Sequence, residues 1–207
     1  MARSESITAG QILGHAFELT RQEGIGALTA RKVAAHAGCS TQPVFKAYKN
    51  MDELWEAVYE KAAEFFRDYY SLYPRTGKAP FSNLGMAYIS FAAKEKQLFR
   101  MLFIREGSST ETPKYSMYEL LNGPDGNVVY EVNLAGSMGC QDPSGLFMKM
   151  WMLIHGAACM ALTGDYDLSE EETLVFLEKT CKTFLKEEEE YRNGQAGGHH
   201  IQNQGKI

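Results

Sequence analysis

Residues 28–47 contain two short helical segments that begin with the same arrangement of apolar and capping residues. In the first, Thr29 is a typical N-cap, and Leu28 and Val33 have the spacing of a hydrophobic staple around it. The segment has room for only about two turns, because Gly38 follows it and favours the end of a helix.

The second segment repeats the arrangement. Ser40 is the N-cap, Cys39 and Val44 hold the staple positions, and Pro43 is tolerated because it lies in the first turn. Two helices of about two turns each, joined by a glycine-containing turn of about three residues, form a helix-turn-helix.

Apolar residues recur at helical spacing along most of the remaining chain, so we predict an all-α fold. Residues 127–135 fit either a helix or a strand, and their helical surroundings favour the helix. The segment 105–143 is the least regular in pattern because Gly, Ser, Thr and Pro cluster in it. The long helix predicted from Asn50 has about 20 residues and ends before Pro74. The other helices predicted besides the helix-turn-helix are 12–23, 82–94, 97–104, 114–121, 143–163 and 169–190.

The predicted helices divide into a small head and a larger body. We place a three-helix domain at residues 1–50, a helical domain at 51–192 and a flexible tail at 193–207, which has no apolar pattern. The long helix that Asn50 caps belongs to both domains and joins them without a flexible linker.

Charge is distributed unevenly along the chain, although the net charge of -5 alone argues against a nucleic-acid ligand. Residues 1–50 hold six basic and three acidic side chains, whereas the rest holds 15 and 23. The head is therefore basic and the body acidic, an asymmetry that favours contact between the head and nucleic acid.

Other classes of protein fit the sequence less well. The most apolar stretch, 147–162, is broken by Lys149 and His155 and is shorter than a membrane span, and no secretory signal opens the chain. We therefore expect a cytoplasmic protein that contacts no membrane. The four cysteines have neither metal-ligand spacing nor the density of a disulfide scaffold, so we expect free thiols and no metal or other cofactor.

The segment from Gly14 to Val58 resembles the DNA-binding domain of TetR-family transcriptional regulators, in order and almost without gaps. In the body, Trp151, His155 and Gly156 form a W-x3-H-G element, with Leu98-Phe99-Arg100 before it, similar to one subgroup of that family. The residues that carry the first resemblance are Ala16-Phe17, Gly24, Leu28-Thr29, Val33 to Gly38, Ser40, Val44-Phe45, Tyr48 and Asp52-Glu53-Leu54.

The second helix of a helix-turn-helix presents its amino-terminal half to base edges in the major groove. Here Gln42 can pair with adenine, Thr41 can bond a base or phosphate, and Pro43 or Val44 can contact a thymine methyl group, with Lys46 beyond them.

Phosphate contacts are predicted around both ends of the helix-turn-helix. Thr29, Arg31 and Lys32 gather amides and positive charge at a helix start. The resemblance further implies that Tyr48 and Lys49 contact the DNA backbone. Phe45 replaces the family's usual phosphate-bonding tyrosine, and Met51 stands where lysine is common, so we expect weaker nonspecific affinity than in a typical relative.

The body is rich in aromatic and sulfur-containing side chains, which can line a cavity for a small, largely apolar molecule. The resemblance implies a homodimer through the last two long helices, at about 144–163 and 169–188. It also implies repression of a DNA operator that the ligand relieves, although activation stays open. The predicted ligand-binding residues are Tyr59, Tyr88, Phe91, Phe99, Met101, Met148, Met152 and His155.

An enzyme and a small-molecule carrier or sensor are the alternatives to a DNA-binding regulator. No nucleophile with a base, carboxylate pair or metal cluster has recognisable spacing, so we predict no enzymatic activity. A helical carrier or sensor that binds a small molecule without acting through DNA is the stronger alternative.

Overall fold

The computed structural model describes residues 7–104 and 115–198 and contains only helices in those ranges, as the sequence predicts. Besides the α-helices there are one 3-10 turn (η1) and one π-helical segment (η2). In chain order the elements are α1 (Ala9–Glu23), η1 (Ile25–Ala27), α2 (Ala30–His36), α3 (Thr41–Ala47), α4 (Met51–Leu72), α5 (Ser82–Lys94), α6 (Lys96–Phe99), η2 (Arg100–Ile104), α7 (Met117–Asn122), α8 (Asn127–Ser137), α9 (Pro143–Thr163) and α10 (Glu170–Gly198).

Local capping explains where several helices begin and end. Asp142 accepts a hydrogen bond from the Gly145 amide at 2.9 Å at the start of α9, and Gly164, with φ +89°, ends that helix. At α10, Ser169 and Glu172 accept hydrogen bonds from each other's backbone N–H groups, at 3.2 and 2.9 Å. These caps confirm the predicted starts of both long helices.

Other predicted bounds need correction at the carboxyl end. Helix α10 continues to Gly198, so residues 193–198 are helical although we assigned them to a flexible tail. No proline interrupts this polar stretch, and helical backbone bonding can continue through it without an apolar face. Residues 199–207 and the first part of the irregular segment, 105–114, lie outside the described residues. The ambiguous segment 127–135 is helical, as part of α8.

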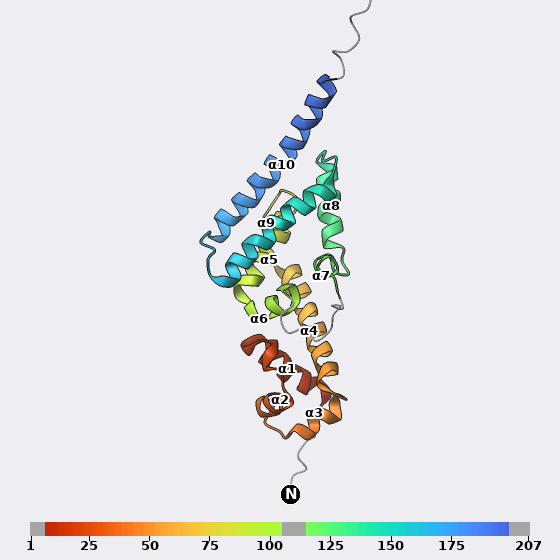
Figure 1. The fold of residues 1–207 in the computed structure, drawn as a ribbon, viewed down its shortest axis with the longest axis vertical. Helices are drawn as coiled ribbons and strands as arrows, with labels where there is room; N and C mark the ends of the chain where they lie inside the picture. Colours follow the sequence, from red (N-terminus) through yellow and green to blue (C-terminus); the bar gives the residue numbers. More distant parts are fainter. Residues whose placement is uncertain (1–6, 105–114, 199–207) are drawn as a thin grey trace, which may run out of the picture. The chain divides into compact units, whose positions relative to one another are not determined.

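The chain forms two compact units, and each contains two stretches of sequence. The first unit comprises Met1–Leu72 and Phe91–Leu121, and the second comprises Tyr73–Ser90 and Asn122–Ile207. The division differs from the boundary that we predicted at residue 50, because α4 packs against α1 and the whole of α4 falls in the first unit. Figure 1 shows α1, α2 and α3 gathered around the amino-terminal part of α4.

Aromatic rings form much of the core of the first unit. The ring of Phe66 on α4 lies 5.0 Å from that of Phe91 and 4.9 Å from that of Phe103, measured between centroids. Phe99 packs on Phe103 at 5.2 Å. These edge-to-face and tilted contacts connect α4 with α5, α6 and η2, so the long helix and the segment after residue 91 are one packed body.

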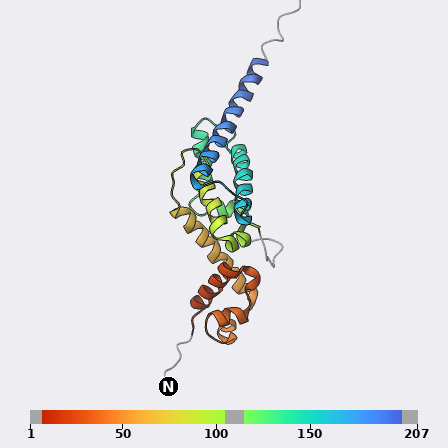
Figure 2. The same cartoon turned by 90° about the vertical axis from the view of Figure 1, so that its left-hand side faces the viewer.

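In the second unit, helices α5, α9 and α10 approach closely at Gly85. A β-carbon at this position would lie 2.8 Å from a methyl carbon of Leu177 and 3.0 Å from Ile154, so any side chain here would force these neighbours to shift. Both views show the last part of α10 extending past α9 (Figure 1, Figure 2).

The start of α5 depends on a buried carboxylate. Phe81 has φ +65°, which is strained for a residue with a side chain, and its N–H donates to Glu131 at 2.7 Å. Glu131 is only 2% exposed. Burial raises the pKa of this carboxyl group, and the Phe81 hydrogen bond opposes that change.

Helix α9 has 21 residues, more than the apolar stretch we identified in the sequence, and an 18-residue window in it has a mean hydropathy of 1.4. By length and composition it could cross a membrane, which corrects our estimate that the stretch is too short. One such helix is weak support for a membrane span, because the core helices of many soluble proteins meet the same criteria.

Candidate nucleic-acid interface

The first helix of the helix-turn-helix, α2, begins with the predicted N-cap. The Thr29 hydroxyl accepts a hydrogen bond from the Lys32 amide at 3.3 Å. Arg31 and Lys32 are both exposed, but the Lys32 ammonium pairs with Glu23 at 2.6 Å. A phosphate must therefore compete with Glu23 for Lys32, whereas Arg31 is exposed at the same helix start.

A tight turn orients α3 relative to α2. Gly38 has φ +65°, a conformation that glycine adopts without strain, and the Cys39 amide donates to the Ala34 carbonyl at 2.9 Å. Ser40 precedes α3 in extended conformation, although its side chain makes no capping hydrogen bond. The predicted connection between the two helices is confirmed, with α2 and α3 in contact.

The amino-terminal half of α3 presents polar side chains to solvent. Gln42 and Lys46 are exposed, and Thr41 and Pro43 are partly exposed. Val44 is only 1% exposed and belongs to the core of the head, so our prediction that it can contact a thymine methyl group does not fit this structure. Pro43 is the residue that can still make such a contact.

Phe45 is a candidate that sequence reasoning treated only as a lost phosphate contact. Its ring is 53% exposed on α3, next to the predicted base-reading residues. A large apolar side chain on the solvent face of such a short basic helix could have been recognised as a possible contact to sugars or thymine methyl groups. Phe45 therefore extends the candidate surface.

Tyr48 and Lys49 follow α3 and connect it to other parts of the head. The Tyr48 hydroxyl donates to the Ala9 carbonyl at 3.4 Å, and burial, followed by the charge of Glu53, raises the pKa of Tyr48. The Lys49 amide donates to Glu53 at 2.6 Å, and the Lys49 side chain is exposed. At the start of α4 the Glu53 amide donates to Asn50 at 2.8 Å, which confirms Asn50 as the cap.

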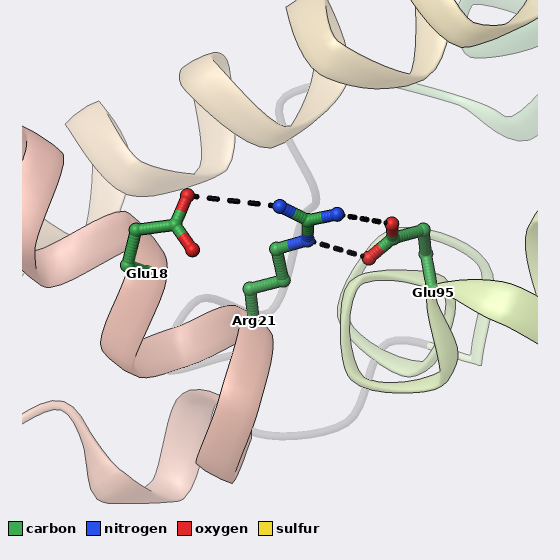
Figure 3. A network of polar contacts seen from close by, with 3 residues as sticks. All are labelled: Glu18, Arg21 and Glu95. Carbon is green, nitrogen blue, oxygen red and sulfur yellow. Dashed lines mark hydrogen bonds and ion pairs between the residues drawn. The ribbon is translucent and has the colours of Figure 1, made fainter.

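The end of α1 is held to the segment between α5 and α6 by a charged pair that the sequence did not indicate (Figure 3). The Arg21 guanidinium bonds both carboxylate oxygens of Glu95, and its Nε donates at 2.8 Å. It also lies 3.7 Å from Glu18. The Glu95 hydrogen bond is the main reason that the pKa of Arg21 is raised.

A close backbone approach adds to this attachment. A β-carbon on Gly24, which ends α1 with φ +86°, would lie 2.9 Å from the side-chain oxygen of Gln97 on α6. The head therefore meets α6 through both a bidentate ion pair and direct packing. Because bidentate arginine pairs fix geometry as well as contribute energy, α6 constrains the orientation of α1.

We expect Glu95→Gln to loosen α1 without unfolding the protein. The amide removes the charge and leaves a single acceptor for Arg21, and we expect a loss of about 1 kcal/mol, reduced by solvent screening of the partly exposed guanidinium. Hydrogen exchange of the α1 amides should become faster. Glu18→Gln is the matched control, because its contact is longer and more exposed; equal effects of the two variants would contradict the role of Glu95.

The predicted ligand-binding residues are divided between the two units. Tyr59, Phe91, Phe99 and Met101 are buried in the first unit, and Tyr88 and His155 meet in the second. Met148 and Met152 are 53% and 63% exposed on α9, so they do not line an interior cavity of the single chain as we expected. We reassign these two methionines to a surface discussed below.

Tyr88 and His155 form the best-defined polar contact inside the second unit. The fully buried Tyr88 hydroxyl lies 2.9 Å from His155 Nδ1, and His155 Nε2 lies 3.7 Å from the sulfur of Cys159. Trp151 packs edge-to-face on Tyr88, at 4.8 Å between ring centroids. The Trp and His of the W-x3-H-G element thus surround one buried tyrosine.

Burial keeps this cluster neutral. It raises the pKa of Tyr88 and Cys159 and lowers the pKa of His155. The neutral Tyr88 hydroxyl and His155 Nδ1 share one hydrogen bond, whose donor depends on the tautomer of His155. The residues described include no group of three or more His, Cys, Asp or Glu side chains able to hold a metal ion.

The lowered pKa of His155 predicts a pH dependence of stability. The unfolded chain binds a proton at His155 with a pKa of about 6.5, and the folded chain binds it less readily, so stability falls as the pH decreases through this region. We expect the melting temperature to decrease between about pH 7.5 and 5.5. His155→Gln should reduce that decrease, as measured by circular dichroism; an unchanged slope would rule out His155 as its source.

The comparisons with known proteins agree with this geometry. Residues 12–58 match the family model of bacterial regulatory proteins of the tetR family. This range contains α2, α3 and the start of α4, together with most of α1. The match confirms the resemblance predicted from the sequence. No curated protein matches the chain.

Solved structures resemble almost the whole chain at low sequence identity. A TetR-like transcriptional regulator from Rhodococcus sp. RHA1 is 17% identical, with a TM-score of 0.59 over 90% of this chain and 98% of its own. A TetR-family member from Streptomyces coelicolor A3 is 18% identical, with a TM-score of 0.54 over 82% and 95%. A transcriptional regulator from Rhodococcus sp. RHA1 is 16% identical, with a TM-score of 0.55 over 87% and 97%. These similarities establish a shared fold.

Proposed function

We propose, from the premise that residues 12–58 form a tetR-family DNA-binding domain, that this chain is a homodimeric transcriptional repressor that a small apolar ligand releases from its operator. The observation that carries the proposal is the exposed face of α3. Gln42 and Lys46 are exposed there, on a helix whose buried Val44 packs into the head. A helix of this size fits the major groove, and its exposed side chains can reach base edges.

An exposed apolar face on α9 supports the dimer. Met148, Met152 and Met160 are separated by four and eight residues and therefore share one side of the helix. Gly156 lies between them, and a β-carbon there would meet nothing within 4 Å. On α10, Val175 and Phe176 are also exposed. Apolar residues spaced in this way are typical of a helix that packs against another chain.

Both helices overlap the ranges that we predicted for dimerisation, 144–163 and 169–188, and α10 extends beyond the second range. A second copy related by twofold symmetry would place the same surface of each chain against the other. Two heads in one dimer would then bind two half-sites about one DNA turn apart, roughly 34–36 Å.

Coupling between ligand and DNA is proposed to act through the first unit. Helix α4 contacts α1 and also packs on the aromatic core at Phe91 and Phe103. Arg21 and Glu95 connect the same α1 to the beginning of α6. A ligand that favours another arrangement of these helices must lower DNA affinity by the factor by which DNA lowers ligand affinity. The location that suits this function is the cytoplasm, where the chromosome is accessible.

Genomic footprinting of the purified protein tests the proposal. We expect enrichment of a near-palindromic site, and a ligand screen against that site should find a compound that releases the protein. Absence of any enriched site at low salt, where phosphate contacts are strongest, would favour a carrier or sensor that does not act through DNA.

A further inference from the structure

A groove lies between α1 and α4. It encloses about 470 Å³ and is lined by side chains of these two helices alone. That volume is in the range of sites for small molecules, roughly 300–1,000 Å³. All of its walls belong to the first unit.

The apolar wall of the groove consists of two aromatic rings that already attract cations. Phe17 and Phe65 lie 5.6 Å apart between centroids. The ammonium nitrogen of Lys61 lies 5.5 Å from the centre of Phe17, and the guanidinium carbon of Arg21 lies 5.0 Å from the centre of Phe65. The chain itself therefore supplies cations to both rings, at distances typical of cation–π contacts.

The polar wall is mainly anionic. Glu18, Glu64 and Asp68 line the groove, and Lys61 is the opposing charge among its lining residues. Glu18 is near Arg21, but Glu64 and Asp68 form no ion pair within residues 7–104 and 115–198. These two carboxylates are four residues apart on α4, where like charges repel each other. A positive group placed near them would relieve that repulsion.

We propose that this groove binds an organic cation with an aromatic or aliphatic body. The body lies against Phe17 and Phe65, where it displaces the Lys61 ammonium from the Phe17 ring, and the cationic group lies near Glu64 and Asp68. An anionic ligand would meet three carboxylates instead. The site goes beyond the proposed function because it lies between α1 and α4 of the first unit, and its test requires no DNA.

Benzyltrimethylammonium is a suitable probe, and phenylacetate is a control of similar size and opposite charge. Each is titrated into the full chain by isothermal titration calorimetry. We expect the cation to bind at one site and phenylacetate to show no binding. Equal binding of the two compounds, or no binding of the cation, would overturn the proposal.

Variants locate the bound cation. The double variant Glu64→Gln/Asp68→Asn changes two exposed side chains and should weaken binding about tenfold through the lost charges. Lys61→Met removes the competing ammonium and should strengthen binding about threefold. Glu56→Gln is the matched control, since Glu56 is exposed on α4 and does not line the groove.

Weaker cation binding in Glu64→Gln/Asp68→Asn and stronger binding in Lys61→Met together distinguish a specific site from general attraction to an acidic surface. General attraction would make Glu56→Gln as harmful as the groove variants. Unchanged binding in Glu64→Gln/Asp68→Asn would likewise overturn the proposal, as would weaker binding in Lys61→Met. Circular dichroism of each variant confirms that the change in binding does not come from unfolding.

Discussion

A protein with Gln42→Ala and Lys46→Ala is expected to bind its operator at least about 100-fold more weakly than the wild type. Each bidentate base contact contributes about 1–3 kcal/mol of discrimination, and a dimer loses the contact in both heads. Both side chains are exposed on α3, so their removal leaves the packing of Val44 intact. Fluorescence anisotropy with the footprinted operator measures the loss.

The two single variants should affect different properties of DNA binding. Gln42→Ala should relax discrimination between operator and mutated operator, because glutamine reads a base edge. Lys46→Ala should weaken binding to all sequences and reduce the salt dependence by about one phosphate contact per head. Glu56→Ala, on the exposed side of α4, serves as the control. Operator binding that survives the double variant would remove α3 from the role of reading helix.

Local sequence patterns predicted the helix ends well because a cap involves residues that are close in the chain. Thr29, Asn50 and Ser169 each accept a hydrogen bond from the amide three residues later. Such a contact depends on side-chain chemistry and spacing alone. The same reasoning missed the capping box of Thr8 and Gln11 at α1, although its spacing is present in the sequence.

The DNA-contacting face was harder to predict, and Val44 shows why. Our interpretation gave it two roles, as the staple partner of Cys39 and as a contact to thymine. A side chain on a seven-residue helix cannot face both the core and the groove, and burial of Val44 decides between them. A helix of two turns contains too few apolar positions to show from the sequence alone which side faces the core.

Contacts across long sequence separations left no pattern to recognise. Arg21 and Glu95 are 74 residues apart, and neither belongs to a motif. The sequence also could not show what Met148 and Met152 contact. An amphipathic helix has the same apolar spacing whether its apolar side faces a ligand, the core or another chain. Only their exposure in the folded chain separates these possibilities.

Met152→Glu is expected to convert the proposed dimer into a monomer. Met152 is the most exposed apolar side chain of α9, at 63%, and it lies between Met148 and Gly156 on the proposed interface. A buried carboxylate without a partner is strongly disfavoured, so we expect dimer affinity to fall at least about 100-fold. In the single chain the side chain is solvated, and the fold should be unaffected.

Loss of the dimer should also weaken operator binding, since each head then binds a half-site without the benefit of a linked partner. Linkage of two binding modules can raise affinity about 100- to 10,000-fold, and the monomer should lose a comparable factor. Met138→Glu is the matched control, because Met138 is also exposed but caps the end of α8. Sedimentation equilibrium and anisotropy measure the two effects. If Met152→Glu remains dimeric, α9 is not the dimer interface. If the variant is monomeric yet binds the operator normally, the two heads act independently and the dimer does not raise the affinity for DNA.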